Sequence, residues 1–150
     1  MESIGAKHQK YDVLKLSEFI IKYYNDNNKR ITKMRLQEIL YFMQAYFLLQ
    51  TDNVCFIDNI EAHIEGPVIN AVNNKYRDAG IDPLYVSKTY VRPDFTDADI
   101  ELIREVLNFT YDWSNTMMTN LIHDQRPFRH ARDSHSKVIP PEKLKKYFAK

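Results

Sequence analysis

The sequence contains one cysteine and three glycines among 150 residues, and its 21 Lys and Arg barely outnumber its 20 Asp and Glu. Because Cys55 has no partner for an intrachain disulfide, and the N-terminus lacks a signal-peptide pattern, we expect a protein of the reducing cytoplasm. Transmembrane helices need roughly 20 consecutive apolar residues, so the sequence predicts no membrane span. The net charge of +1 excludes the overall basic field that holds nucleic acid non-specifically.

The composition is instead that of a globular chain. Hydrophobic residues make up 44% of the sequence and aromatic residues 13%, including ten Tyr and eight Phe. A chain of this length suits one domain with a packed core. We therefore predict a single domain over residues 12–150 and a disordered polar tail over residues 1–11.

Apolar residues recur at helical spacing in several segments. Val13, Leu16 and Ile20 follow Asp12, which is a suitable N-cap. A second helix is predicted over residues 32–50, and apolar side chains cover nearly its whole circumference, so it should be central and buried. Further helical segments are predicted to begin at Pro67, at Thr96, at Ser114, after Pro127, and at Pro140 and Pro141.

Two short segments have the character of strands. Residues 60–64 alternate between apolar and polar side chains, and residues 85–91 are β-branched and aromatic. Gly66 ends the first strand, Pro67 suits the first turn of a helix, and Gly80 is a natural stop for it. The predicted fold is mainly α, a compact single-domain bundle of six or seven helices with a short two-stranded antiparallel β-ribbon formed by the two strands.

Three blocks of residues, in order along the chain, carry a resemblance to a known family. The first is the helical run LQEILYFMQAY at residues 36–46, and the second is EAHIEGPV at residues 61–68. A third and weaker block comprises Leu121, His123, Pro127, Phe128, Ala131 and Arg132. Together they resemble the Panacea domain, the family that includes SocA-like antitoxins, and the resemblance extends from about residue 12 to residue 148.

Three positions depart from the family's pattern. Glu38 stands where the family usually has Lys, and we expect this change to reverse a charge on the surface of the helix. His63 and Phe128 each replace a Trp. These two changes alter the shape and polarity of aromatic positions, so they affect a carried-over binding surface more than the fold.

The resemblance implies a prophage-associated antitoxin that neutralises a cognate protein toxin by direct contact. Members of this group are similar to one another while guarding against chemically unrelated toxins. At least one relative also hands its toxin to a cytosolic AAA+ protease. Delivery to a ClpXP-type protease is therefore a second expectation.

Nine residues follow as candidates for the partner-binding site: Gln37, Tyr41, Glu61, His63, Gly66, Pro67, Tyr76, Trp113 and His123. Tyr76 and Trp113 are candidate anchors, because exposed aromatic side chains often dominate interface energies. Structural roles remain open for the others. Glu61 could accept hydrogen bonds from amides at a helix start, Gly66 and Pro67 could shape a turn, and Gln37 could bind the backbone of that turn.

The histidines and the cysteine do not have the spacing or surroundings expected of metal ligands or a catalytic nucleophile. His123, His130 and His135 lie close in sequence, but no pair has the i, i+4 spacing that places two metal ligands on one helical face. Cys55 lies in an apolar stretch and is expected to be a small buried hydrophobe rather than a nucleophile. We therefore predict no metal, no cofactor and no enzymatic activity.

One local cluster of positive charge supports an alternative function. Arg126, Arg129 and Arg132 surround Phe128, and Arg beside an aromatic ring can stack on bases or bind phosphates. A nucleic-acid-binding regulator is thus the alternative. A solvated helix face or contact with an acidic protein partner accounts for the same cluster, so a nucleic-acid partner is not the favoured expectation.

Overall fold

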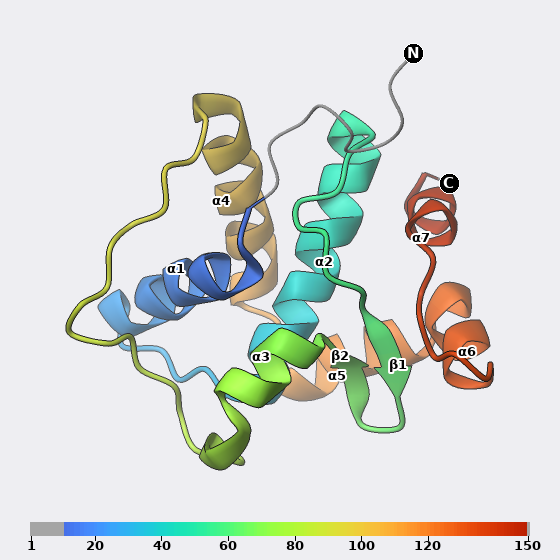
Figure 1. The fold of residues 1–150 in the computed structure, drawn as a ribbon, viewed down its shortest axis with the longest axis horizontal. Coiled ribbons are helices and arrows are strands. Elements are labelled where there is room, and N and C mark those ends of the chain that lie inside the picture. Colours follow the sequence, from blue (N-terminus) through green and yellow to red (C-terminus); the bar gives the residue numbers. More distant parts are fainter. Residues whose placement is uncertain (1–10, 150) are drawn as a thin grey trace.

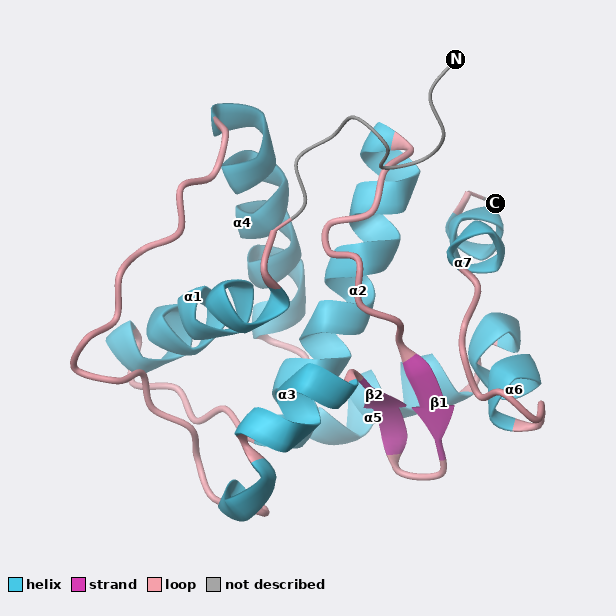
Figure 2. Cartoon of the chain, in the orientation of Figure 1, coloured by secondary structure: helices cyan, strands magenta, loops and turns pink. Residues whose placement is uncertain are grey.

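The computed structural model describes residues 11–149, which form a mainly helical fold with one β-ribbon, as predicted (Figures 1 and 2). The helices are α1 (Val13–Asp26), α2 (Lys33–Thr51), α3 (Asn70–Lys75), α4 (Asp97–Tyr111), α5 (Asn115–His123), α6 (Arg126–Arg132) and α7 (Pro141–Phe148). The strands are β1 (Glu61–His63) and β2 (Gly66–Val68), and a 3-10 turn spans Arg77–Ala79. None of the helices in this part of the chain is long and apolar enough to cross a membrane.

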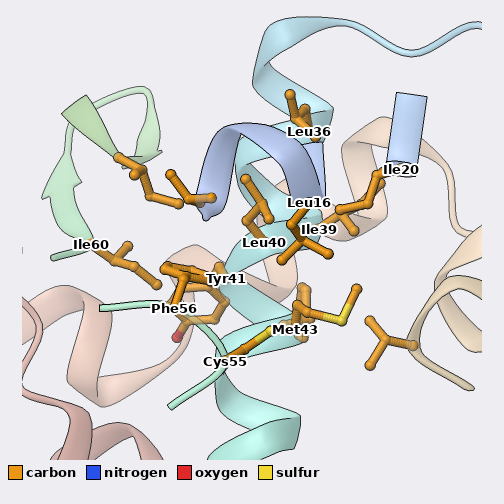
Figure 3. Close-up of a cluster of buried hydrophobic side chains, with 14 of the residues drawn as sticks. Leu16, Ile20, Leu36, Ile39, Leu40, Tyr41, Met43, Cys55, Phe56 and Ile60 are labelled. Carbon is orange, nitrogen blue, oxygen red and sulfur yellow. The ribbon is translucent and has the colours of Figure 1, made fainter. Parts of the chain in front are cut away.

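Helix α2 is the central element, as its all-round apolar pattern predicts. It lies between α1 and α4 on one side and α6 and α7 on the other (Figure 1). Figure 3 shows the core around it: Leu16, Ile20, Leu36, Ile39, Leu40, Tyr41, Met43, Cys55, Phe56 and Ile60. Each large side chain buried there stabilises the fold by about 1.5–3 kcal/mol relative to exposure.

Four predicted helix starts, at Asp12, Thr32, Thr96 and Ser114, are confirmed by capping hydrogen bonds. The helix predicted after Pro127 begins just before it, at Arg126. Asp12 Oδ1 accepts from the backbone amides of Leu14 and Lys15, at 2.8 and 3.1 Å. Thr32, Thr96 and Ser114 each cap the next helix in the same way, and Pro140 and Pro141 begin α7. Each cap satisfies amides that have no partner within the helix.

The predicted N-terminal tail, residues 1–11, falls outside the described residues except for Tyr11. That side chain is buried. Its hydroxyl donates a 2.5 Å hydrogen bond to Asp99 Oδ2, and its amide donates to the Cys55 carbonyl at 3.1 Å. Residue 11 therefore belongs to the packed body.

The predicted partner of the first strand is wrong. Strand β1 pairs with β2 through a two-residue turn, and its other edge is bound by residues 137–139, where Ala62 N donates to Lys137 O at 2.7 Å. Both edges of β1 are thus occupied, and no edge remains for residues 85–91. That segment is a loop, held by the amide of Val86, which donates to Asn25 Oδ1 at 3.0 Å.

The helix predicted from Pro67 begins three residues later, at Asn70. Pro67 lies in β2, and its missing N–H costs no ladder hydrogen bond at the edge of so short a ribbon. Gly80, the predicted stop, ends the 3-10 turn that follows α3, in a backbone conformation with φ of +58°. The sequence therefore predicted this helix, but the place of Pro67 and both ends of the helix were wrong.

Candidate functional site

The three sequence blocks that carry the family resemblance meet in space. Strand β2 packs on α2 and on α5, while β1 packs on α6. In Figure 1 the hairpin of β1 and β2 lies beside α2, with α5 behind it and α6 next to it. Segments separated by up to about ninety residues thus build one unit, and its centre is the hairpin.

A set of buried side-chain hydrogen bonds fixes this hairpin and the neighbouring loops on α2. Gln37 Oε1 accepts from the backbone amide of Ile69 at 2.6 Å, and Tyr41 donates from its hydroxyl to Gln125 Oε1 at 2.5 Å. Both Gln37 and Tyr41 are buried, and burial raises the pKa of Tyr41 far above its ordinary value. The structure therefore buries these two candidates beneath the hairpin and the turn between α5 and α6. We call the buried side chains of α2 that make these contacts the frame.

Glu38 is part of the same buried frame, so the expectation that it lies on the helix surface is wrong. Its side chain is 1% exposed because neighbouring elements cover α2 on every side. Glu38 Oε2 accepts a 2.8 Å hydrogen bond from the Thr119 hydroxyl on α5. Burial raises the pKa of its carboxyl group to about 7, although the Thr119 hydrogen bond and Arg35 oppose this.

Gly66 links the hairpin to this carboxylate. Its φ of +145° lies in a region that residues with a side chain rarely adopt, and a Cβ there would lie 3.7 Å from Glu38 Oε2. Since that distance is an ordinary contact, the backbone conformation rather than the space requires glycine. Gly66 and the buried Pro67 therefore have the turn-shaping role that the sequence left open.

Glu61 and His63 form a small polar group on the outside of the hairpin. Glu61 Oε1 lies 2.9 Å from His63 Nε2, and Glu61 Oε2 accepts from the side-chain amide of Asn70 at 3.1 Å. Glu61 thus contacts the start of α3 as expected, but through the side chain of Asn70 rather than a backbone amide. Both Glu61 and His63 are partly exposed and accessible to a partner.

The remaining candidates contact different parts of the molecule. Trp113 is half-buried, with its ring 5.3 Å from that of Phe42 on α2. Tyr76 is half-buried at the end of α3, and burial raises its pKa to about 12. His123 packs on Phe128, with ring centroids 4.7 Å apart. Trp113 thus contacts α2 and Tyr76 lies at the end of α3, while His123 contacts α6 within the unit around the hairpin.

The three arginines of the alternative nucleic-acid patch also diverge. Arg129 donates to the carbonyl of Asp124, and Arg132 Nε lies 3.3 Å from Asp133 Oδ1. Arg126 lines a hollow between α6 and α7.

Three exposed apolar side chains near the hairpin were not identified as candidates from the sequence. Ile64, in the hairpin turn, is 84% exposed, and Met117 and Leu121 on α5 are 45% and 37% exposed. Alternation with Ile60 and Ala62 favoured an inward Ile64, but the strand ends at His63. Met117 and Leu121 are spaced i, i+4 and share one face of α5. We call these three side chains the apolar surface.

The chemistry for catalysis or metal binding is sparse in the described part of the chain. Burial raises the pKa of the Cys55 thiol well above its ordinary value, so it holds its proton. Between residues 11 and 149, no three His, Cys, Asp or Glu side chains gather closely enough to hold a metal ion.

These features define a mainly helical domain in which a β-hairpin packs against a buried central helix. The chain belongs to the antitoxin SocA-like, Panacea domain family, whose model matches residues 36–128, more than half of the sequence. The match extends from α2 through the hairpin to α6 and includes all the elements that meet at the hairpin. No curated protein and no solved structure matches the chain.

Proposed function

We propose that this protein is a cytoplasmic antitoxin that neutralises a cognate toxin by direct, stoichiometric binding, and that it is not an enzyme. Membership of the family supports a general antitoxin or adaptor role. The observation that carries the specific proposal is the apolar surface, because Ile64, Met117 and Leu121 remain exposed on a rigidly held unit. Exposed apolar side chains of this kind mark contact sites when they gather on one face.

The hairpin and α5 both pack on α2, close to the Glu38 carboxylate. Gly66, two residues after Ile64, lies beside this carboxylate, and Thr119 on α5 donates to it. Strand β2 packs directly on α5. The turn and the exposed face of α5 therefore keep a fixed relative position, which lowers the entropy lost on binding.

Binding would remove these side chains from water. Fully burying one Ile, Met or Leu side chain contributes about 1.5–3 kcal/mol, so a few such contacts are enough to serve as the centre of an interface. Trp113 and Tyr76 are less suited as anchors, because much of each ring already packs on the core. Glu61 and His63 provide polar contacts at the edge of the apolar surface.

The first test is growth of cells that express the reading frame adjacent to this gene, with and without this protein. The proposal requires that the neighbour arrests growth and that the protein restores it. The Met117→Ser/Leu121→Ser double variant should lose this rescue. The matched control is Ile81→Ser/Val91→Ser, which removes two exposed apolar side chains on other parts of the surface. Equal rescue by both variants, with both expressed and folded, would contradict the proposed surface.

Masking and delivery of the toxin are distinguished by the toxin's lifetime. We propose that masking is sufficient and that delivery to a ClpXP-type protease, if it occurs, adds to it. Under masking, rescue persists in cells without the protease and the toxin accumulates in a stable complex. Rescue that disappears with the protease, together with a longer-lived toxin, would show that delivery is required.

A further inference from the structure

A hollow between α6 and α7 gathers positive charge. Its volume is about 280 Å³, and it is lined by Arg126, Pro127, His130, Lys143, Lys146 and Tyr147. The two helices lie next to each other at the edge of the molecule (Figure 1). Three permanent cations and a histidine thus face one small space with no carboxylate in its lining, in a chain whose net charge is only +1.

Within the described residues, the cations of this hollow differ from their neighbours in having no acidic partner. Lys145, between the two lysines of the hollow, binds Asp52, and Arg132 binds Asp133. Among residues 11–149, no carboxylate makes an ion pair with Arg126, Lys143 or Lys146. Three like charges held together without a counter-charge create a local positive potential that attracts an anionic group.

The walls of the hollow are fixed by the core. Pro127 and its neighbour Phe128 are buried on α6, and the Phe128 ring lies 6.5 Å from that of Tyr41 on α2. On α7, Leu144 is buried while Lys143 and Lys146 lie outside it. The cations therefore project from anchored helices, so an incoming anion meets groups whose backbones are already in place.

We propose that this hollow binds a carboxylate-rich segment of another protein. Its volume of about 280 Å³ suits one or two carboxylate side chains. A nucleic-acid backbone needs a longer stripe of cations. Arg129 and Arg132 do not line the hollow, and they bind the Asp124 carbonyl and Asp133. The site is separate from the apolar surface and does not depend on the toxin being the partner.

The test is fluorescence anisotropy with a labelled short polyglutamate peptide, a polyglutamine peptide of the same length, and labelled oligothymidylate. The Lys143→Gln/Lys146→Gln variant should bind polyglutamate on the order of tenfold more weakly, as expected for the loss of two partly exposed ion pairs. The matched control, Lys88→Gln/Arg104→Gln, removes the same charge from exposed positions elsewhere. Its affinity should stay close to that of the unchanged protein.

Three results would overturn the proposal. Polyglutamate that binds no better than polyglutamine would show that the hollow takes no carboxylates. Equal weakening in both double variants would show that binding follows net charge rather than this site. Tighter binding of oligothymidylate, lost in the hollow variant, would assign the site to nucleic acid. Since the substituted lysines are exposed, unchanged thermal melting checks that the fold is intact, and Arg126→Gln provides a second variant on the opposite wall.

Discussion

Glu38 should give this protein an unusual dependence of stability on pH. In the unfolded chain a glutamate releases its proton near pH 4.5, whereas in the fold burial holds the pKa of this carboxyl group at about 7. Between these values the folded state binds more protons than the unfolded state, so the free energy of unfolding falls as pH rises. Below the lower value and above the higher one, this contribution is constant. The full difference corresponds to about 3 kcal/mol.

The substitution Glu38→Gln isolates this contribution. Glutamine has nearly the same shape, and its amide oxygen can still accept from the Thr119 hydroxyl. We expect wild type and variant to have similar free energies of unfolding below about pH 5. Above about pH 8 the variant should be more stable by up to about 3 kcal/mol, because it has no buried charge to form.

The assay is urea denaturation followed by circular dichroism across this pH range. The control is Glu65→Gln, which removes a carboxylate from the exposed hairpin turn. It should leave the pH dependence of the wild type unchanged. A difference between wild type and Glu38→Gln that is the same at every pH would refute the reasoning, since it would mean that Glu38 does not titrate differently in the two states.

Three further predictions concern buried residues. Tyr41→Phe leaves the buried Gln125 oxygen without its donor and should cost about 1–3 kcal/mol in urea denaturation; a neutral effect would mean that water replaces the hydroxyl. Gly66→Ala forces a side chain into a backbone with φ of +145° and should cost about 1–3 kcal/mol, measured as a lower melting temperature. Cys55 is fully buried with a raised pKa, so a thiol reagent should label it only as fast as the protein unfolds. Rapid labelling under native conditions would contradict its place in the core.

Much of the helical framework follows from local signals. The caps at Asp12, Thr96 and Ser114 and the all-round apolar pattern of α2 act within one or two turns of the chain. Such signals are readable because each residue's partner is a few positions away. The strand pairing failed for the opposite reason. The edges of β1 are filled by β2 and by residues 137–139, and nothing in residues 85–91 encodes that competition.

The candidate site shows the same limit at the level of single residues. Glu38 has the charge of a surface residue, and only the packing of α5 and the hairpin over α2 makes it buried. Ile64 has the character of a core residue, yet one position past the end of β1 it faces water. In both cases elements distant in sequence decide whether the side chain is buried. Sequence pattern and propensity alone therefore predict the wrong exposure for both residues.

Residues that carry the family resemblance can be divided by burial into those that support the fold and those that a partner could contact. Gln37, Tyr41 and Gly66 lie within matched blocks, and all three are buried. Gln37 binds the amide of Ile69 after β2, Tyr41 binds Gln125 before α6, and Gly66 gives β2 its backbone conformation. A match at such positions marks a shared scaffold, whereas recognition of one particular toxin has to use exposed positions such as Ile64 and Met117. Substitutions that disrupt the contacts of these three residues should therefore lower stability and rescue together. Substitutions on the apolar surface should abolish rescue while the melting temperature stays within a few degrees of wild type.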